Sequence, residues 1–193
     1  YHPEGDVFTH TMLVIDVASH VKQKTDHPLW FMWACLLHDI GKPLVTTSDG
    51  HAPLHNEAGV QVFHGVPLIT SKKERQYIST MIMYHMHLMN MSRHQARDIS
   101  YLRLLKKNDG KVSMNDLIYI SCCDKLGRGK VAQEQSDAFW TFIQDIQQRL
   151  GCQAIPALID GHDLIEYGFH NHQCFKDMLE EAYDLQLQGY SKE

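Results

Sequence analysis

Apolar residues recur at helical spacing from the start of the chain. One such stripe runs from Val7 to Val21, and Asp6 stands before it where an N-cap residue belongs. The next segment, Trp30 to Leu37, is apolar on every side, which predicts a buried helix. This second helix is expected to end at Gly41 and Pro43, because glycine and proline commonly follow helix C-termini.

Further helices are predicted along the rest of the chain, two of them opened by a serine that an acidic residue follows three positions later. Three of them are expected to begin near Asn56, at Ser71 (with Glu74) and at Ser113 (with Asp116). Two more are expected to span Gln135 to Leu150 and Cys174 to Gln188. Residues 44–54, rich in Thr, Ser, Asp, Gly and Pro, are expected to form a loop. Because no convincing strand alternation or internal repeat occurs, the fold class is expected to be all-α.

The composition is that of one ordinary globular domain. Of 193 residues, 44% are hydrophobic and 21% charged, which excludes a disordered or fibrous chain. The longest apolar run, Leu29 to Leu37, is too short to cross a bilayer, and no signal peptide is recognisable, so a cytoplasmic protein without membrane association is expected. The net charge of -5 gives no general attraction to nucleic acid, although a local basic patch stays possible.

Cysteine and histidine usage narrows the chemistry. The five cysteines have no CxxC spacing, so neither a disulfide framework nor a thiolate zinc site is indicated. The fourteen histidines are the compositional outlier. Since histidine is the commonest metal ligand, their placement is the first place to look for a site.

Three ligand-type side chains lie on predicted core helices. His10 shares the apolar stripe of the first helix and should face the core, where a histidine held by a hydrogen bond is the alternative interpretation. His38 and Asp39 end the buried helix, where an ionised carboxylate is costly unless a cation or paired donors neutralise it. The negative end of the helix dipole also favours a cation there.

Asp124 is the fourth such residue. Leu117 and Ile120 place it on the inward face of its helix, and a salt bridge to Lys125 or Arg128 is the alternative interpretation. Taken together, two imidazoles and two carboxylates on three apolar helices predict a metal site. The mixed nitrogen and oxygen donors suit Mn, Fe, Ni, Co or Mg better than a thiolate-selecting metal.

Such a site predicts hydrolytic chemistry, because a bound metal acidifies water and polarises a phosphoryl oxygen. Asp39 is the ligand best placed to orient or deprotonate that water. His55 and His85 are candidates to extend the site to two ions about 3.5–4 Å apart. Lys42 and Arg128 are candidates to hold phosphate oxygens, although both would be equally at home on a solvated surface.

Several motifs resemble those of a known superfamily. His10, the string HDIGK at 38–42 and Asp124 resemble the H...HD...D signature of the HD superfamily. The resemblance is closer still to the HD region of bacterial tRNA nucleotidyltransferases, the CCA-adding enzymes. It is carried by HPEGDV at 2–7, THT at 9–11, His55 with Glu57 and Gly59, Tyr84-His85, Gly127-Arg128, GHDL at 161–164 and Tyr167-Gly168.

The resemblance implies an all-helical HD bundle with metal-dependent phosphodiesterase or phosphatase activity, in that family toward 2',3'-cyclic nucleotides and 2'-phosphates. Some HD relatives hold two metals with histidines at positions similar to His55 and His85. Two departures stand out: the chain has no Asp-x-Asp pair of a nucleotidyltransferase head, and Cys122-Cys123 precede Asp124 where the family has an acidic and a small residue.

The sequence therefore predicts an HD phosphohydrolase core over residues 1–150 and a short helical extension over residues 151–193, packed on or beside the core. Its expected substrates are nucleotide or RNA-end phosphoesters, and its cofactor is one or two divalent ions.

The alternative is the tRNA-binding C-terminal half of an RNA nucleotidyltransferase without catalysis of its own; the chain starts at Tyr1 rather than Met and could be an excerpt. A structural domain without turnover is a third hypothesis. The sequence indicates no oligomeric state.

Overall fold

The structure is a computed structural model that describes residues 6–67, 71–129, 133–170 and 172–192. Within these ranges it contains helices and no strand, which confirms the all-α fold class. The helices are α1 (Val7–Val21), η1 (Lys22–Lys24), α2 (Pro28–Leu37), α3 (Lys42–Val45), α4 (His55–His64), α5 (Lys72–Tyr84), α6 (His87–Arg93), α7 (Asp98–Asn108), α8 (Met114–Leu126), α9 (Gln133–Leu150), α10 (Gly161–Glu166), η2 (His172–Cys174) and α11 (Phe175–Leu187).

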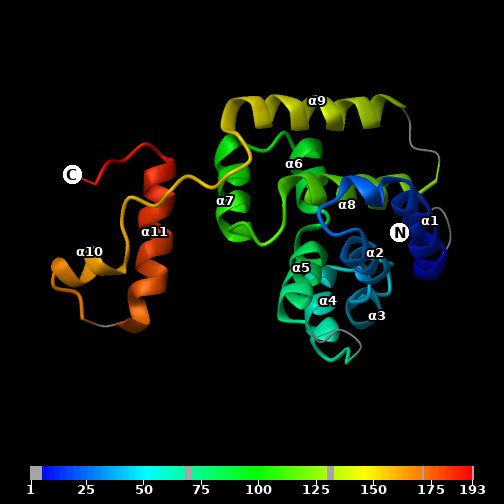
Figure 1. The fold of residues 1–193 in the computed structure, drawn as a ribbon, viewed down its shortest axis with the longest axis horizontal. Helices are drawn as coiled ribbons and strands as arrows, with labels where there is room; N and C mark the ends of the chain where they lie inside the picture. The colour runs from blue at the N-terminus through cyan, green and yellow to red at the C-terminus, as the bar shows by residue number, and fades with distance from the viewer. Residues whose placement is uncertain (1–5, 68–70, 130–132, 171, 193) are drawn as a thin grey trace.

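Helix α2 lies at the centre of the bundle, packed against α1, α5 and α8 (Figure 1). Phe31, Ala34 and Cys35 are fully buried there, which accounts for the apolar character of the segment. The prediction of burial on every side is wrong at Leu36, which is 41% exposed. Since apolar atoms also make up much of any protein surface, an apolar run does not by itself show which face is covered.

Three of the predicted helix starts are confirmed by hydrogen bonds. In each, a side-chain oxygen accepts from the backbone N–H three residues later and so satisfies a donor that the first helical turn leaves without a partner. These bonds join Asp6 and Thr9 (2.7 Å), Ser71 and Glu74 (3.5 Å), and Ser113 and Asp116 (3.1 Å). The Asp116 carboxylate is buried and accepts from Tyr77 Oη at 2.5 Å, which ties α8 to α5.

Four α-helices depart from the sequence predictions. Residues 44 and 45, expected in a loop, belong to α3, because Pro43 lies in its first turn, where a missing backbone N–H costs nothing. Helices α6 and α7 were not predicted. Helix α10 was not predicted either, although its capping box between Asp160 and Asp163 is visible in the sequence.

The C-terminal segment lies beside α7 and apart from the rest of the bundle (Figure 1). The Arg103 guanidinium of α7 donates to both Asp184 oxygens of α11, each at 2.8 Å. The Tyr183 hydroxyl donates to the carbonyl of Ile155 at 2.9 Å. The expected division at residue 150 stays a prediction. Among the described residues, no helix has the length and apolar character needed to span a membrane.

Candidate metal centre

All six candidate ligands are buried at one place in the bundle. They come from five separate elements: His10 from α1, His38 and Asp39 from the end of α2, His55 from the first turn of α4, His85 from the end of α5 and Asp124 from α8. A fold that brings six metal-ligating groups into its interior has to neutralise or ligate them, because unpaired buried charges are costly.

The ligand atoms form two sets. In the first set, His10, His38 and Asp124 each offer one atom, and these atoms lie within 4.8 Å of one another. The second set, Asp39, His55 and His85, meets the same condition. Within the first set, His10 Nε2 lies 3.1 Å from Asp124 Oδ1 and 3.3 Å from His38 Nε2.

The carboxylate of Asp39 lies between the two sets. Its Oδ2 is 3.2 Å from His38 Nε2, and its Oδ1 is 3.3 Å from His55 Nε2 and 3.9 Å from His85 Nε2. Each oxygen therefore faces a different set. A carboxylate in this position could bind one ion with one oxygen and a second ion with the other.

The tautomers of three histidines fit a cation. His38, His55 and His85 each place Nδ1 at 2.7–2.8 Å from the backbone carbonyl three residues earlier. Since a carbonyl only accepts, each Nδ1 must carry a proton, and in the neutral form of each ring the lone pair therefore lies at Nε2. Metal-bound histidines are commonly fixed by a hydrogen bond of this kind.

The surroundings of two of these Nε2 atoms also indicate a cation site. The buried Nε2 atoms of His55 and His85 have no hydrogen-bond partner among the described residues, and they lie 3.3 and 3.9 Å from Asp39 Oδ1. A lone pair that faces a carboxylate is unfavourable unless a positive ion or a proton lies between them. The donor set therefore fits a divalent metal.

Electrostatics divides the groups into charged and neutral ones. Burial by itself would raise the pKa of Asp39, but His38 and the Lys42 ammonium outweigh burial and hold that pKa well below its ordinary range. Burial would likewise raise the pKa of Asp124, but its hydrogen bond with His10 and the nearby cations hold it low. Both carboxylates are therefore ionised at neutral pH.

The imidazoles of the second set are neutral at pH 7. Burial lowers the pKa of His85 to about 4, and it also lowers the pKa of His55. Burial would lower the pKa of His38 too, but the charge of Asp39 outweighs it and raises that pKa. Neutral imidazole is the form that binds a metal, so His55 and His85 need no deprotonation to do so.

The two candidate phosphate-binding cations lie at the mouth of the cluster. Lys42 is buried rather than on a solvated surface, and its Nζ is 2.5 Å from Asp39 Oδ2. The Nη2 atom of Arg128 lies 3.2 Å from both Asp124 oxygens, so the salt bridge considered as an alternative for Asp124 is present; Lys125 instead donates to Gln135. A pocket of about 200 Å³ opens there, lined by Val7, Lys42, Thr46, Gly50, His51, Ala52, His55, Met86 and Arg128.

Sequence reasoning missed part of this mouth. Thr46, His51 and Met86 were not among the candidate residues that the sequence indicated. Thr46 and His51 lie between α3 and α4, and Met86 lies between α5 and α6, so helical periodicity does not place them. Leu54, the residue before His55, has the left-handed φ of 56°, a conformation that costs a non-glycine residue roughly 1–2 kcal/mol.

Close backbone approaches hold these elements together. A Cβ atom on Gly41 would lie 2.1 Å from the His55 carbonyl oxygen and 2.3 Å from Gly59 N. A Cβ atom on Gly127 would lie 2.4 Å from Val14 Cγ2. Glycine at 41 thus lets the chain after Asp39 touch the first turns of α4, and glycine at 127 lets the end of α8 touch α1, one turn after His10.

A Gly41→Ala substitution is expected to lower the free energy of unfolding by about 3 kcal/mol, because the added methyl group overlaps backbone that cannot rotate away. It should also weaken metal binding by moving His55 away from Asp39. Gly65→Ala is the matched control: its Cβ would lie 3.4 Å from the nearest atom, so a change within about 0.5 kcal/mol is expected. Equal denaturation midpoints for the two variants would contradict the close approach.

The comparison with known families agrees with this geometry. The HD domain family matches residues 7–128, which include all six candidate ligands. The chain belongs to the HD domain family. The HD family is associated with metal-dependent phosphohydrolases, and the buried His and Asp clusters are consistent with that chemistry.

Curated relatives share one name. The Multifunctional CCA protein of Pseudomonas aeruginosa is 29% identical over 205 aligned residues, which cover 100% of this chain and 45% of that protein. The Multifunctional CCA protein of Actinobacillus pleuropneumoniae is 27% identical, over 88% of this chain and 40% of that protein. The one from Halorhodospira halophila is 37% identical, over 45% of this chain and 21% of that protein. The HD chain thus spans less than half the length of these relatives. No solved structure matches it.

Proposed function

We propose that this HD domain is a metal-dependent phosphohydrolase that acts on nucleotides or RNA ends, such as 2',3'-cyclic phosphates or 2'-phosphates. The observation that carries the proposal is the arrangement around Asp39. Three histidines with Nδ1 fixed to carbonyl oxygens direct Nε2 toward one ionised, buried carboxylate. This arrangement is unfavourable for a structural polar network and favourable for divalent ions.

The proposed ligands follow the two sets. His10, His38, Asp39 and Asp124 would hold one ion, and Asp39, His55 and His85 would hold a second. Nitrogen and oxygen donors of this kind suit Mn, Fe, Ni, Co or Mg. When bound, such an ion lowers the pKa of a water molecule and polarises a phosphoryl oxygen.

The chain's own groups would orient the reactants. The ionised Asp39 carboxylate can accept a hydrogen bond from the attacking water and fix its direction. Lys42 and Arg128 line the pocket above the cluster, where their N–H groups can hold phosphate oxygens through charge-assisted hydrogen bonds. The buried Nε of Arg128 has no hydrogen-bond partner among the described residues.

The test is elemental analysis of the purified protein, paired with hydrolysis of 2',3'-cyclic AMP and of a generic phosphodiester, with and without added Mn, Ni and Mg. We expect bound metal and metal-dependent turnover that chelation abolishes and re-addition restores. Bound metal without turnover, or protein that takes up no metal, would contradict the proposal.

A second candidate function rests on the relatives. Because the chain spans less than half of proteins named Multifunctional CCA protein, it could be the tRNA-binding half of an RNA nucleotidyltransferase whose other half performs nucleotide addition. A gel-shift titration with tRNA at low salt tests it, since phosphate contacts are strongest there. Binding at low micromolar protein without phosphodiester hydrolysis would favour this function over the first.

A further inference from the structure

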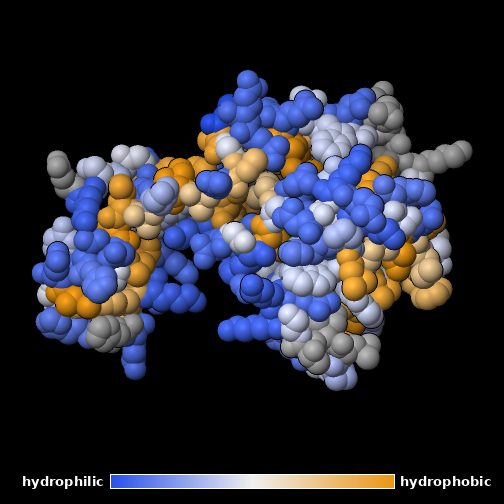
Figure 2. Space-filling view, in the orientation of Figure 1, coloured by the Kyte–Doolittle hydropathy of each residue, from blue (hydrophilic) through white to orange (hydrophobic). Residues whose placement is uncertain are grey.

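A large cavity lies away from the metal cluster, between α7 and the α10–α11 segment. Its volume is about 850 Å³, within the range of pockets that bind small molecules and cofactors. None of the six candidate metal ligands lines it. The space-filling view shows hydrophilic side chains on both sides of the hollow between the C-terminal segment and the bundle (Figure 2).

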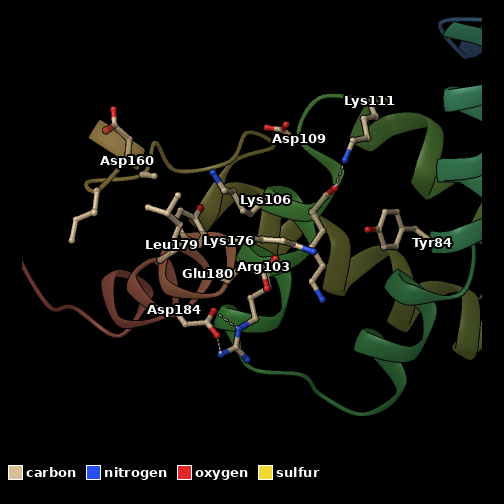
Figure 3. Close-up of a pocket in the computed structure, with 15 residues that line it drawn as sticks. Tyr84, Arg103, Lys106, Asp109, Lys111, Asp160, Lys176, Leu179, Glu180 and Asp184 are labelled. Carbon is tan, nitrogen blue, oxygen red and sulfur yellow. Dashed lines mark hydrogen bonds and ion pairs between the residues drawn. The ribbon is translucent and has the colours of Figure 1, made fainter. Parts of the chain in front are cut away.

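Four lysines contribute positive charge to this cavity. Lys106 and Lys107 belong to α7 and Lys111 to the turn that follows it, whereas Lys176 belongs to α11 on the opposite wall. Figure 3 shows Lys106, Lys111 and Lys176 around the cavity. None of the four forms an ion pair with another described residue. Arg103, by contrast, is already neutralised by Asp184.

The acidic residues of the wall offset this charge only in part. Asp184 is occupied by Arg103, and Asp160 accepts the backbone N–H groups of His162 and Asp163 at the start of α10. Asp160 keeps its charge, because backbone N–H groups carry none, so Asp109, Asp160 and Glu180 face four lysines. The cavity lining therefore carries an excess of one positive charge in a chain whose net charge is -5.

The remaining wall suits an aromatic ring. Tyr84 is half-buried and turns its hydroxyl toward the lysine side of the cavity (Figure 3). Leu179 and Ile159 also line the cavity and add apolar surface. Aromatic and apolar side chains next to a cluster of ammonium groups match a ligand that has a flat base at one end and phosphates at the other.

We propose that the cavity between α7 and α11 binds a nucleoside polyphosphate, with its phosphates held by Lys106, Lys107, Lys111 and Lys176. This site is separate from the proposed metal centre and does not depend on the proposed hydrolysis. Lysine presents three donors on a flexible stem, so lysines from two walls can converge on a polyphosphate. The Lys111 ammonium donates one hydrogen bond to the Lys107 carbonyl and keeps two donors.

Charge outside the cavity favours a compact ligand over RNA. Residues 151–193 contain eight Asp and Glu residues and two Lys residues, and Asp177 and Glu181 of α11 are exposed. A phosphate chain that continued beyond the cavity would pass this acidic surface and be repelled. A mononucleotide keeps its phosphates among the lysines.

Calorimetric titration of ATP into the full chain, in low salt with EDTA, tests the site. The decisive variant is Lys107→Ala/Lys176→Ala, which removes one ammonium from each wall. Lys72→Ala/Lys73→Ala is the matched control, since it removes two exposed lysines from the start of α5. We expect one ATP per chain, bound about tenfold or more weakly by the cavity variant and equally by the control.

Asp39→Ala separates this site from the metal cluster, because ATP bound in the cavity should be unaffected by that change. Thermal unfolding of the cavity variant should match that of the unsubstituted chain. The proposal fails if ATP gives no saturable heat, if both lysine pairs weaken binding alike, or if Asp39→Ala abolishes it. It also fails if a short single-stranded RNA binds through Lys107 and Lys176 more tightly than ATP.

Discussion

An Asp39→Ala substitution is expected to lower metal-dependent phosphodiester hydrolysis on the order of 10³-fold or more. Asp39 is the only described carboxylate that faces both ligand sets, with one oxygen toward His38 and the other toward His55. Its removal takes a ligand from both ions and the proposed hydrogen-bond acceptor from the water. Elemental analysis should therefore show loss of metal alongside the loss of turnover.

Two further variants test whether the loss of activity in Asp39→Ala comes from the loss of this particular carboxylate. Asp16→Ala removes an exposed carboxylate from α1 and should leave both metal content and rate unchanged. Asp39→Asn keeps the size of the side chain and separates the lost charge from lost packing, so it should also lose metal. Full hydrolysis with retained metal in Asp39→Ala would refute the assignment of Asp39.

Helical periodicity was sufficient to predict the burial of the first candidate ligands. His10 lies one turn before the fully buried Val14, and Asp124 follows the buried Ile120 at the same spacing. For a residue inside a long helix, the face it shares with apolar neighbours determines whether it is buried. The sequence of each helix was therefore enough to predict that His10 and Asp124 are buried.

Residues at helix ends were harder to place. His55 follows a left-handed residue and His85 is the C-cap of α5, so their direction depends on turns that periodicity does not describe. Periodicity did not place Lys42 either. The sequence was equally compatible with a solvated surface, but the short helix α3 turns Lys42 inward onto Asp39. Short helices such as α3 and α6 take their positions from packing rather than from local propensity.

The number of ions decides how much of the cluster takes part in the reaction. A one-ion site needs only His10, His38, Asp39 and Asp124, whereas the arrangement of His55 and His85 around Asp39 Oδ1 predicts a second ion. Two ions in such a site clamp the attacking and leaving oxygens of an in-line displacement. The substitution of a histidine in the second set should therefore remove one ion and spare the other.

His55→Ala and His85→Ala, made separately, are each expected to reduce the metal content from about two ions per chain to about one and to lower kcat on the order of 10²-fold. Each removes a neutral imidazole whose Nε2 faces Asp39, while His10, His38 and Asp124 stay in place. His64→Ala, which removes an exposed imidazole from the other end of α4, should change neither quantity. If the unsubstituted chain binds one ion and His55→Ala keeps it with full activity, the second set is a structural network and the hydrolysis proceeds with a single metal.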